Sequence, residues 1–343
     1  MTTANDSSMH TLLDWNLQRS PDGGEMVIAE LMNQNNQFNQ ILPYREANDG
    51  VGHKVGVRTS LPLAEKSAIG KRHKATHGTI AIVTQPTAMA VTMAKVNYDL
   101  AKLNGGDAAL LREAAPHAEA LAQLVEGAML YGDSNTSELD PIGLNIRRSS
   151  LSGESAKVVI DMGGTTNLSS IYLLGLGPGA LYGIFPKGSA TAGLEALDFP
   201  LVMDQTSDGE IPVYKSRWSQ TYGLAEEDHR YTQRLANLSM SDIAAGTGTT
   251  KAIIFGMKKA LARVTARKRI KVGPQGINHY WLMSTPMFEG LLHQIDTNVS
   301  QGAGIRYDNF DNGFVQLLNV PMFGGMPIIF SDQLLNGSET QVV

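Results

Sequence analysis

The residues with the clearest chemical potential lie in the stretch VVIDMGGTTNLSSIYLL, residues 158–174. Asp161 ends an apolar run, and two glycines and two threonines separate it from a second apolar run. A Gly-rich turn between two strands can surround a phosphate group with backbone N–H donors. The stretch therefore predicts either a nucleotide site or only a turn between strands.

The rest of the chain favours the turn over an actin-like sugar kinase or ATPase. Only 182 residues follow Asp161, too few for the two lobes of such an enzyme. The stretch GTGTTK, residues 246–251, leads into a helix without a preceding apolar strand. In GIFPKGSA, residues 183–190, the lysine precedes the second glycine, so its grip on the β- and γ-phosphates is lost.

Other residues with catalytic or metal-binding chemistry lack partners. His73 and His77 lie in a basic, hairpin-like segment, which is a poor site for a cation. The His117-Ala118-Glu119 triplet has no cysteine partners, because the chain contains no cysteine. The neighbouring acids Glu226 and Glu227 point to opposite faces of a strand, which favours salt bridges over acid–base catalysis. We predict no catalytic residue, no metal site and no cofactor.

Composition indicates a soluble protein that is stabilised by packing or assembly. Of the 343 residues, 42% are hydrophobic and only 18% are charged, so we expect other copies to cover much of the surface. Without cysteine there can be no disulfide. No secretory signal or membrane-spanning run is present, and we expect a cytoplasmic origin without membrane contact.

Positive charge is concentrated in two segments. Residues 51–85 carry six basic residues and one acid, a net +5, and residues 256–275 carry seven basic residues and no acid, a net +7. Since the whole chain is −5, the remainder carries −17. This separation of basic and acidic segments favours association with copies of the same chain or binding to a polyanion.

The elements are predicted in an unusual order. Residues 1–45 read as a polar arm without a core of its own, and the β-like runs HKVGVRTSL and THGTIAIVT read as a long projecting hairpin. Apolar spacing predicts a long helix over 107–131, which Pro116 should kink or divide. Residues 211–238 should form long strands with one wet face, and alternating helices and strands should follow from about residue 249.

These blocks resemble the major capsid proteins of tailed bacteriophages, whose fold also builds the shell floors of herpesviruses. The resemblance rests on YGDSNTSELDPIGLNIR after a long helix, NLSSIYLLGLGPGALYGIFPKGSATAGLE, VYKSRWSQTYGLAEEDHRYTQRLANL and the closing FGGMPIIFSDQLL, in that order. It implies the α+β tailed-phage capsid fold, with an N-terminal arm (1–45), an extended loop (46–84), a peripheral domain carrying a spine helix (85–240) and an axial domain (241–343).

The resemblance implies a structural protein that assembles into hexamers and pentamers of an icosahedral shell around double-stranded DNA. It also implies a virion location after assembly in the bacterial cytoplasm, with a portal and a cement protein as partners. Because the chain starts almost at the arm, we expect a separate scaffolding protein. A tail-tube subunit is the remaining virion alternative.

The two basic clusters are the candidate contact sites. For the hairpin cluster we expect contacts between subunits, made by Lys54, Arg58, Lys66, Lys71 and Arg72. The second cluster, expected on a helix, faces either a neighbour in the ring or the packaged DNA, and comprises Lys258, Lys259, Arg263, Arg267, Lys268 and Arg269.

Overall fold

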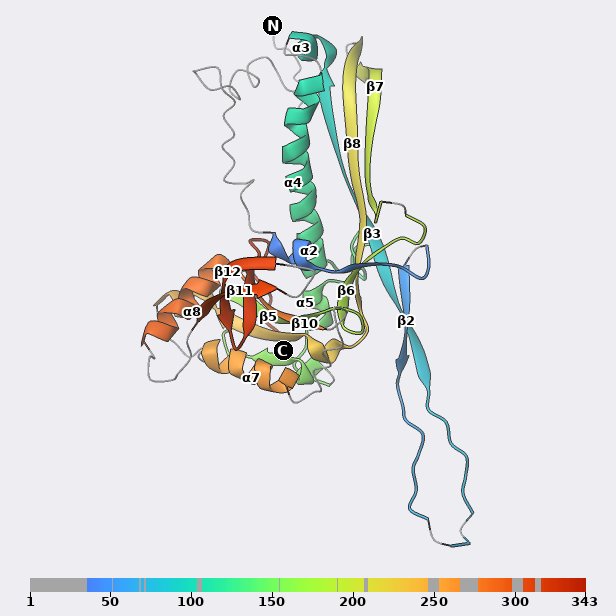
Figure 1. Ribbon diagram of the computed structural model, residues 1–343, viewed down its shortest axis with the longest axis vertical. Coiled ribbons are helices and arrows are strands. Elements are labelled where there is room, and N and C mark those ends of the chain that lie inside the picture. The colour runs from blue at the N-terminus through green and yellow to red at the C-terminus, as the bar shows by residue number, and fades with distance from the viewer. Residues whose placement is uncertain are drawn as a thin grey trace.

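A computed structural model describes residues 36–50, 52–67, 69–70, 72–103, 107–153, 155–189, 191–206, 209–245, 253–265, 277–297, 305–311 and 316–343. Figure 1 shows a body of sheet and helices from which two long projections extend. One holds helix α4 (Asp107–Tyr131) beside strands β3 (Ile80–Asn97), β7 (Leu194–Thr206) and β8 (Gly209–Glu226). The other is a hairpin of β2 (Gly52–Arg58) and the start of β3. The predicted α+β class is confirmed.

Thirteen strands of the described residues join in one sheet. The others are β1 (Tyr44–Glu46), β4 (Val159–Asp161), β5 (Leu168–Leu176), β6 (Leu181–Phe185), β9 (Gln233–Ser239), β10 (Asn278–Met283), β11 (Arg306–Asp311), β12 (Gln316–Phe323) and β13 (Met326–Phe330). The main order is β11-β12-β13-β10-β5-β6-β8-β3-β2. Because β10 pairs with both β5 and β13, segments 85–240 and 241–343 contribute to the same sheet.

Helices cover both faces of the central strands. Tyr172 and Leu174 of β5 belong to the core beneath α2 (Gln37–Ile41) and α4. Ile171 and Leu173 belong to the core beneath α7 (Ile253–Thr265) and α8 (Thr285–Thr297), because successive strand residues point to opposite faces. This double cover explains why every residue of β5 is buried and why the strand reads as an apolar run. Short helices complete the chain: α3 (Tyr98–Leu103), α5 (Leu144–Arg147) and α6 (Met240–Ala245).

The long helix predicted over 107–131 is observed with the same bounds, as α4. Leu121, Val125 and Met129 lie four residues apart and enter the core of the body. Pro116 lies inside the helix and does not divide it into two elements. The helix ends at Gly132, where a Cβ would lie 2.5 Å from the Ala128 carbonyl oxygen.

The predicted hairpin is also observed, but its second strand is longer than expected. β2 and β3 pair antiparallel from Gly52↔Pro86 to Arg58↔Ile80. β3 then continues to Asn97 along β8, which pairs on its other side with β7, a strand that the sequence did not predict.

The prediction of one wet face is wrong for both β8 and β9. The buried residues of β8 recur at every third position from Val213 to Tyr222, so both of its faces contain buried residues, and all seven residues of β9 are buried. β9 lies between β4 and β5, so no edge of the strand meets solvent. The charge of Arg234 on β9 is matched inside the protein by Glu339, 3.0 Å away.

Candidate assembly surfaces

The DMGGTT stretch is a turn between β4 and β5. The Asp161 carboxylate accepts hydrogen bonds from the Gly163 N–H (3.0 Å) and the Asn237 side chain (2.8 Å). Gly163 has a φ of 88°, and a Cβ at Gly164 would lie 2.6 Å from the Asn237 carbonyl oxygen. The glycines serve the turn and its close contact with β9, so the interpretation as a turn is confirmed.

The other stretches with phosphate or metal chemistry do not form such a site in the described part of the chain. Residues 246–251 lie outside it. At the turn after β6, the Gly188 N–H donates to the Glu46 carboxylate (2.7 Å), an anion already present in the chain. Among described residues, no three His, Cys, Asp or Glu side chains gather to hold a metal. His73 contacts Ser67 (2.8 Å) on the hairpin, and His117 stacks on Trp218.

The neighbouring acids Glu226, at the end of β8, and Glu227, just beyond it, have different partners, which agrees with the predicted structural role. Glu226 forms an ion pair with Arg148, whose side chain is fully buried. Glu227 accepts a hydrogen bond from the Tyr182 hydroxyl (2.8 Å). Both carboxylates have structural partners, although Arg148 follows α5 and does not lie on a neighbouring strand.

The projecting hairpin exposes apolar side chains that the chain itself does not cover. Leu61 is 80% exposed, Leu63 68% and Ile82 71%, whereas core leucines of the body such as Leu173 and Leu174 are fully buried. Hydrogen bonds join its two arms, from the Thr59 hydroxyl to the Thr79 hydroxyl (2.7 Å) and from the Leu63 N–H to the Thr76 hydroxyl (3.0 Å). The hairpin is therefore held in shape while its apolar surface remains available for contact.

The basic residues of the hairpin have different surroundings. Lys54 pairs with Asp49 (2.6 Å) at the base of the hairpin. Lys66 and Arg72 are exposed towards its far end. The backbone of Arg58 lies in β2, and its side chain, like all of Lys71, lies outside the described residues.

A second uncovered surface lies on the side of β3, β8 and β7 that faces away from α4, here named the outer face. Ala88 and Ala90 of β3 pack in the core with α4, so the alternating residues between and beyond them face outwards. Its apolar side chains, each between 39% and 49% exposed, are Met89, Val91, Met93, Leu197 and Phe199. An apolar sheet face of this kind is typical of a protein interface.

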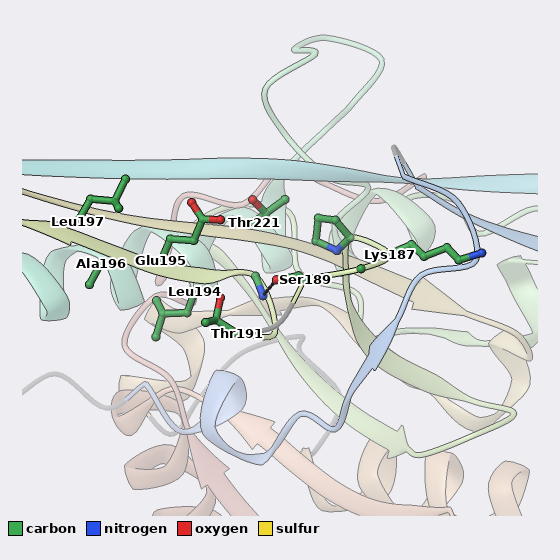
Figure 2. Close-up of a pocket in the computed structure, with 11 residues that line it drawn as sticks. Lys187, Ser189, Thr191, Leu194, Glu195, Ala196, Leu197 and Thr221 are labelled. Atoms are coloured by element: carbon green, nitrogen blue, oxygen red, sulfur yellow. Dashed lines mark hydrogen bonds between the residues drawn. The ribbon is translucent and has the colours of Figure 1, made fainter.

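The outer edge of the same sheet is open as well. Within the described residues β7 pairs only with β8, so its other edge has no hydrogen-bonded strand. Residues 194–206 contain three acids, Glu195, Asp198 and Asp204, and no basic residue. A hollow of about 620 Å³ lies at the start of β7. Thr191, Leu194 and Glu195 are among its lining residues (Figure 2). A long open edge is a template for another strand.

One end of the outer face is held by a cluster of charges. Asp204 of β7 accepts from Lys95 of β3 (2.9 Å) and from Lys215 of β8 (2.5 Å). The hydrogen bonds from Lys215 and Lys95 lower the pKa of Asp204. The two hydrogen bonds of Asp204 join β7 to β3 and β8. With two lysines and one aspartate, the cluster carries one net positive charge.

The second basic cluster is only partly accessible. Lys258 and Lys259 are exposed on α7 beside Phe255, which is also exposed. Arg263 donates to the carbonyl oxygens of Lys157 (3.2 Å) and Val159 (3.0 Å), so it binds its own chain. Arg267, Lys268 and Arg269 lie outside the described residues.

The sequence did not indicate a buried polar network that fastens the C-terminal segment. Arg234 donates to Ser170 (3.0 Å) and pairs with Glu339 (3.0 Å), which also accepts from the Tyr131 hydroxyl (2.6 Å). The side chain of Asn237 bonds to both the N–H and the carbonyl oxygen of Val342, each at 2.9 Å. These partners lie between 64 and 208 residues apart in the sequence, and no local spacing indicates them.

Residues 20–343 match the family model described as major capsid protein GP7. The chain belongs to this capsid protein family. Its role is therefore that of a structural shell protein, and the family and the fold are not enzymatic. Neither the kinase nor the tail-tube alternative is favoured.

A solved structure of a phage particle shares the fold of this capsid protein. A chain of the bacteriophage epsilon15 structure matches it with a TM-score of 0.68 and 16% identity, covering 100% of both chains. The bacteriophage JBD30 capsid matches with a TM-score of 0.46 and 12% identity, covering 89% of this chain and 93% of that one. No curated protein sequence matches the chain.

Membership of a capsid protein family indicates what the exposed surfaces can contact. A capsid protein is a component of the virion and assembles with copies of itself. No helix in the described ranges is long and apolar enough to cross a membrane. The hairpin, the outer face and the open edge of β7 are thus the candidate contacts between copies.

Proposed function

We propose that this capsid protein builds an icosahedral shell around double-stranded phage DNA, and that the hairpin of one copy docks on β7 and the outer face of its neighbour. One observation carries the docking proposal: both surfaces are apolar and uncovered, and they lie on opposite projections of the molecule (Figure 1). β3 connects the two and has eighteen residues, about 60 Å at 3.3 Å each. Because β3 extends through both projections, the hairpin of one copy cannot reach the outer face of that same copy.

Two different surfaces that meet between copies form a heterologous contact, which closes into a ring when the rotation between copies allows it. Hexamers and pentamers are such rings. In this arrangement the chain comprises an arm (1–45), an extended loop (46–84), a peripheral domain (85–240) and an axial domain (241–343). The exposed hairpin and the long α4 beside β3 and β8 support the second and third of these assignments.

Charge supports the same pairing. Residues 51–85 carry a net +5, whereas residues 194–206 carry no basic residue. Asp204 is already paired with Lys95 and Lys215, which leaves Glu195 and Asp198 as the acids of β7. Opposite charges accelerate association and fix the register of two surfaces. Lys66, Lys71 and Arg72 are the hairpin residues that we assign to this contact, with Glu195 as an acid on the facing surface.

Reversing the hairpin charges tests this function. We expect a chain with Lys66, Lys71 and Arg72 changed to Glu to keep its circular dichroism spectrum and to form no closed shells in negative-stain electron microscopy. Adding Glu195→Lys to that chain should restore part of the shell yield, because the two surfaces are again complementary. Normal shells in normal yield from the reversed chain would defeat the proposed contact.

The exposed lysines of α7 contact either a neighbour in the ring or the packaged DNA. Charge reversal of Lys258 and Lys259 distinguishes the two roles. Loss of shells assigns the pair to a ring contact, and normal shells with reduced DNA content assign it to DNA, which basic residues bind without sequence specificity. A separate scaffolding protein, a portal and a cement protein complete the proposed assembly, which takes place in the bacterial cytoplasm.

A further inference from the structure

The base of the hairpin contains a chain of hydrogen bonds that passes through a histidine. His53 is the second residue of β2, and its ring nitrogens contact two different parts of the protein. Nδ1 lies 3.3 Å from the Asn48 N–H, and Nε2 lies 3.0 Å from the Tyr182 hydroxyl on β6. The Tyr182 hydroxyl in turn contacts Glu227, just beyond β8, at 2.8 Å. The hairpin is thereby joined to the body sheet.

The partners determine which nitrogen of His53 carries the proton. The Asn48 N–H can only donate, so Nδ1 must accept. Tyr182 donates its only proton to Glu227, so its oxygen accepts from Nε2–H. Burial, together with the hydrogen bond and charge of Glu227, raises the pKa of Tyr182, which keeps that proton in place. The complete chain therefore requires neutral His53 with its proton on Nε2.

The two strands at the base of the hairpin are fastened by different chemistry. On β3, Gln85 is buried and accepts from the Arg147 guanidinium (2.6 Å), which also donates to the Leu224 carbonyl oxygen (2.8 Å). Burial lowers the pKa of Arg147 to about 10, so its charge persists at neutral pH. On β2, the histidine chain provides the corresponding connection to the sheet. Only the β2 connection changes protonation near neutral pH.

We propose that His53 is a proton-sensitive positioning residue that holds the hairpin in its assembly-competent direction while neutral and releases the segment before β2 when protonated. The proposal rests on the docking role of the hairpin. A protonated ring would place an N–H on Nδ1 against the Asn48 N–H, so two donors would face each other. The bond to Tyr182 would persist, since Nε2 already carries a proton. Release therefore affects residues 47–54 first.

The charged groups around His53 set the pH at which release occurs. Burial is the largest influence and lowers the pKa of His53; Arg45 lowers it further, whereas Glu227 raises it. Arg45 lies 3.9 Å from Glu227 and above the Tyr182 ring, which offsets the pull of that carboxylate. Beyond the turn, Lys54 pairs with Asp49, and Lys187 also acts on Asp49. The connection is thus strongest above the ordinary imidazole pKa of about 6.5 and weakens as the pH falls below it.

Hydrogen exchange of the unassembled full chain tests the proposal. After correction for intrinsic exchange, we expect the amides of residues 47–54 to lose protection by about fivefold to tenfold as the pH falls through the titration of His53, the effect of one lost hydrogen bond. Amides around Gln85 should not change, because Arg147 remains charged. His53→Gln can still accept from Asn48 and donate to Tyr182, and we expect its protection to be independent of pH.

His73→Gln is the matched control, because His73 lies on the exposed part of the same hairpin. It should keep the pH response of the natural chain. Should His53→Gln not fold, Tyr182→Phe removes the next link and should lower protection of residues 47–54 at every pH. A pH response that persists in His53→Gln, unchanged protection in Tyr182→Phe, or no response in the natural chain would overturn the proposal.

The exchange measurement does not involve a neighbouring copy, so it separates this inference from the proposed docking. If residues 47–54 respond to pH and the charge-reversed hairpin still forms shells, the connection exists and the docking proposal fails. If the reversed hairpin blocks assembly and residues 47–54 do not respond, the docking stands and the histidine proposal fails.

Discussion

Glu126 is a carboxyl group enclosed between three segments of the chain. It lies on α4 with no exposed surface, and it accepts from the Asn39 N–H (3.0 Å) and from the hydroxyl of Ser331. Asn39 belongs to α2 and Ser331 follows β13, so one side chain joins residues that are far apart in the sequence. Burial raises the pKa of Glu126 to about 7, although the hydrogen bonds from Ser331 and Asn39 oppose this shift.

The raised pKa of Glu126 predicts how the stability of the subunit depends on pH. The folded chain holds the Glu126 proton more tightly than the unfolded chain, so stability is greatest below the ordinary glutamate pKa of 4.5 and falls as the pH rises through about 7. The loss is on the order of 3 kcal/mol for such a shift. We expect Glu126→Gln, which mimics the protonated form, to remove this loss in urea titrations of the unassembled subunit at several pH values.

Ser331→Ala provides the complementary variant. It removes a hydrogen bond that lowers the pKa of Glu126, so the decline in stability should extend to higher pH than in the natural chain. A decline of the same size in Glu126→Gln would show that another group is responsible.

The partners of buried side chains such as Glu126 and Arg234 could not be predicted from the sequence. Asp161 and its glycines could be assigned to a turn because their role depends on neighbours in the chain. The partners of Arg234 are Ser170 and Glu339, and those of Glu126 are Asn39 and Ser331. Only the folded topology brings these groups together, and a single sequence contains no pattern that pairs them.

Among the elements, those with strong periodicity or turn signals were predicted and those with weak ones were missed. The helix α4 and the β2–β3 hairpin follow from apolar spacing and from two β-branched runs around a polar loop. The second half of β3, TAMAVTMAKVN, has apolar residues at both odd and even positions, and five of its eleven residues are Ala or Met, so neither alternation nor strand propensity identifies it. β7 contains Pro200 within a register shift between Phe199 and Val202, which interrupts its alternation.

The strand β9 contains a bulge that supports a prediction. Ser169 pairs with Leu238 and Ile171 with Leu235, so β9 has one extra residue at this point. Asn237 in the bulge has a φ of 58°, and its side chain bonds to both backbone groups of Val342. The bulge thus turns a strand residue towards the C-terminal segment.

Two substitutions of Asn237 separate its side-chain bonds from its backbone conformation. Both Asn237→Gly and Asn237→Ala lose the bonds to Val342, and we expect each to increase hydrogen exchange at residues 339–343. Alanine is strained at positive φ, so Asn237→Ala should be less stable than Asn237→Gly by about 1 kcal/mol in chemical denaturation. Equal stability of the two variants would show that the bulge relaxes when its side chain is lost.

At the scale of the whole molecule, the surfaces that stabilise the subunit differ from those that we propose for assembly. The body encloses its apolar residues between helices on both faces of the sheet, whereas the hairpin and the outer face expose theirs. The sequence indicated this division through a low charged fraction and a long hairpin that projects from the body. It did not indicate the outer face, because that face depends on β7, the strand that was missed.

This division predicts that apolar hairpin residues are dispensable for the subunit and needed for the shell. Leu61 and Leu63 are 80% and 68% exposed, so changing both to Ser should leave the urea midpoint of the unassembled subunit unchanged. In the shell each leucine that becomes buried contributes about 1.5–3 kcal/mol, and the contact repeats in every subunit. We therefore expect the concentration needed for assembly, measured by light scattering, to rise at least tenfold.

Leu139→Ser is the matched control, since Leu139 is 79% exposed but lies in the turn after α4 and not in the hairpin. This substitution should change neither the urea midpoint nor the concentration needed for assembly. Assembly of the hairpin variant at the natural concentration would mean that these leucines stay in solvent in the finished shell, and that the neighbour is held by other residues.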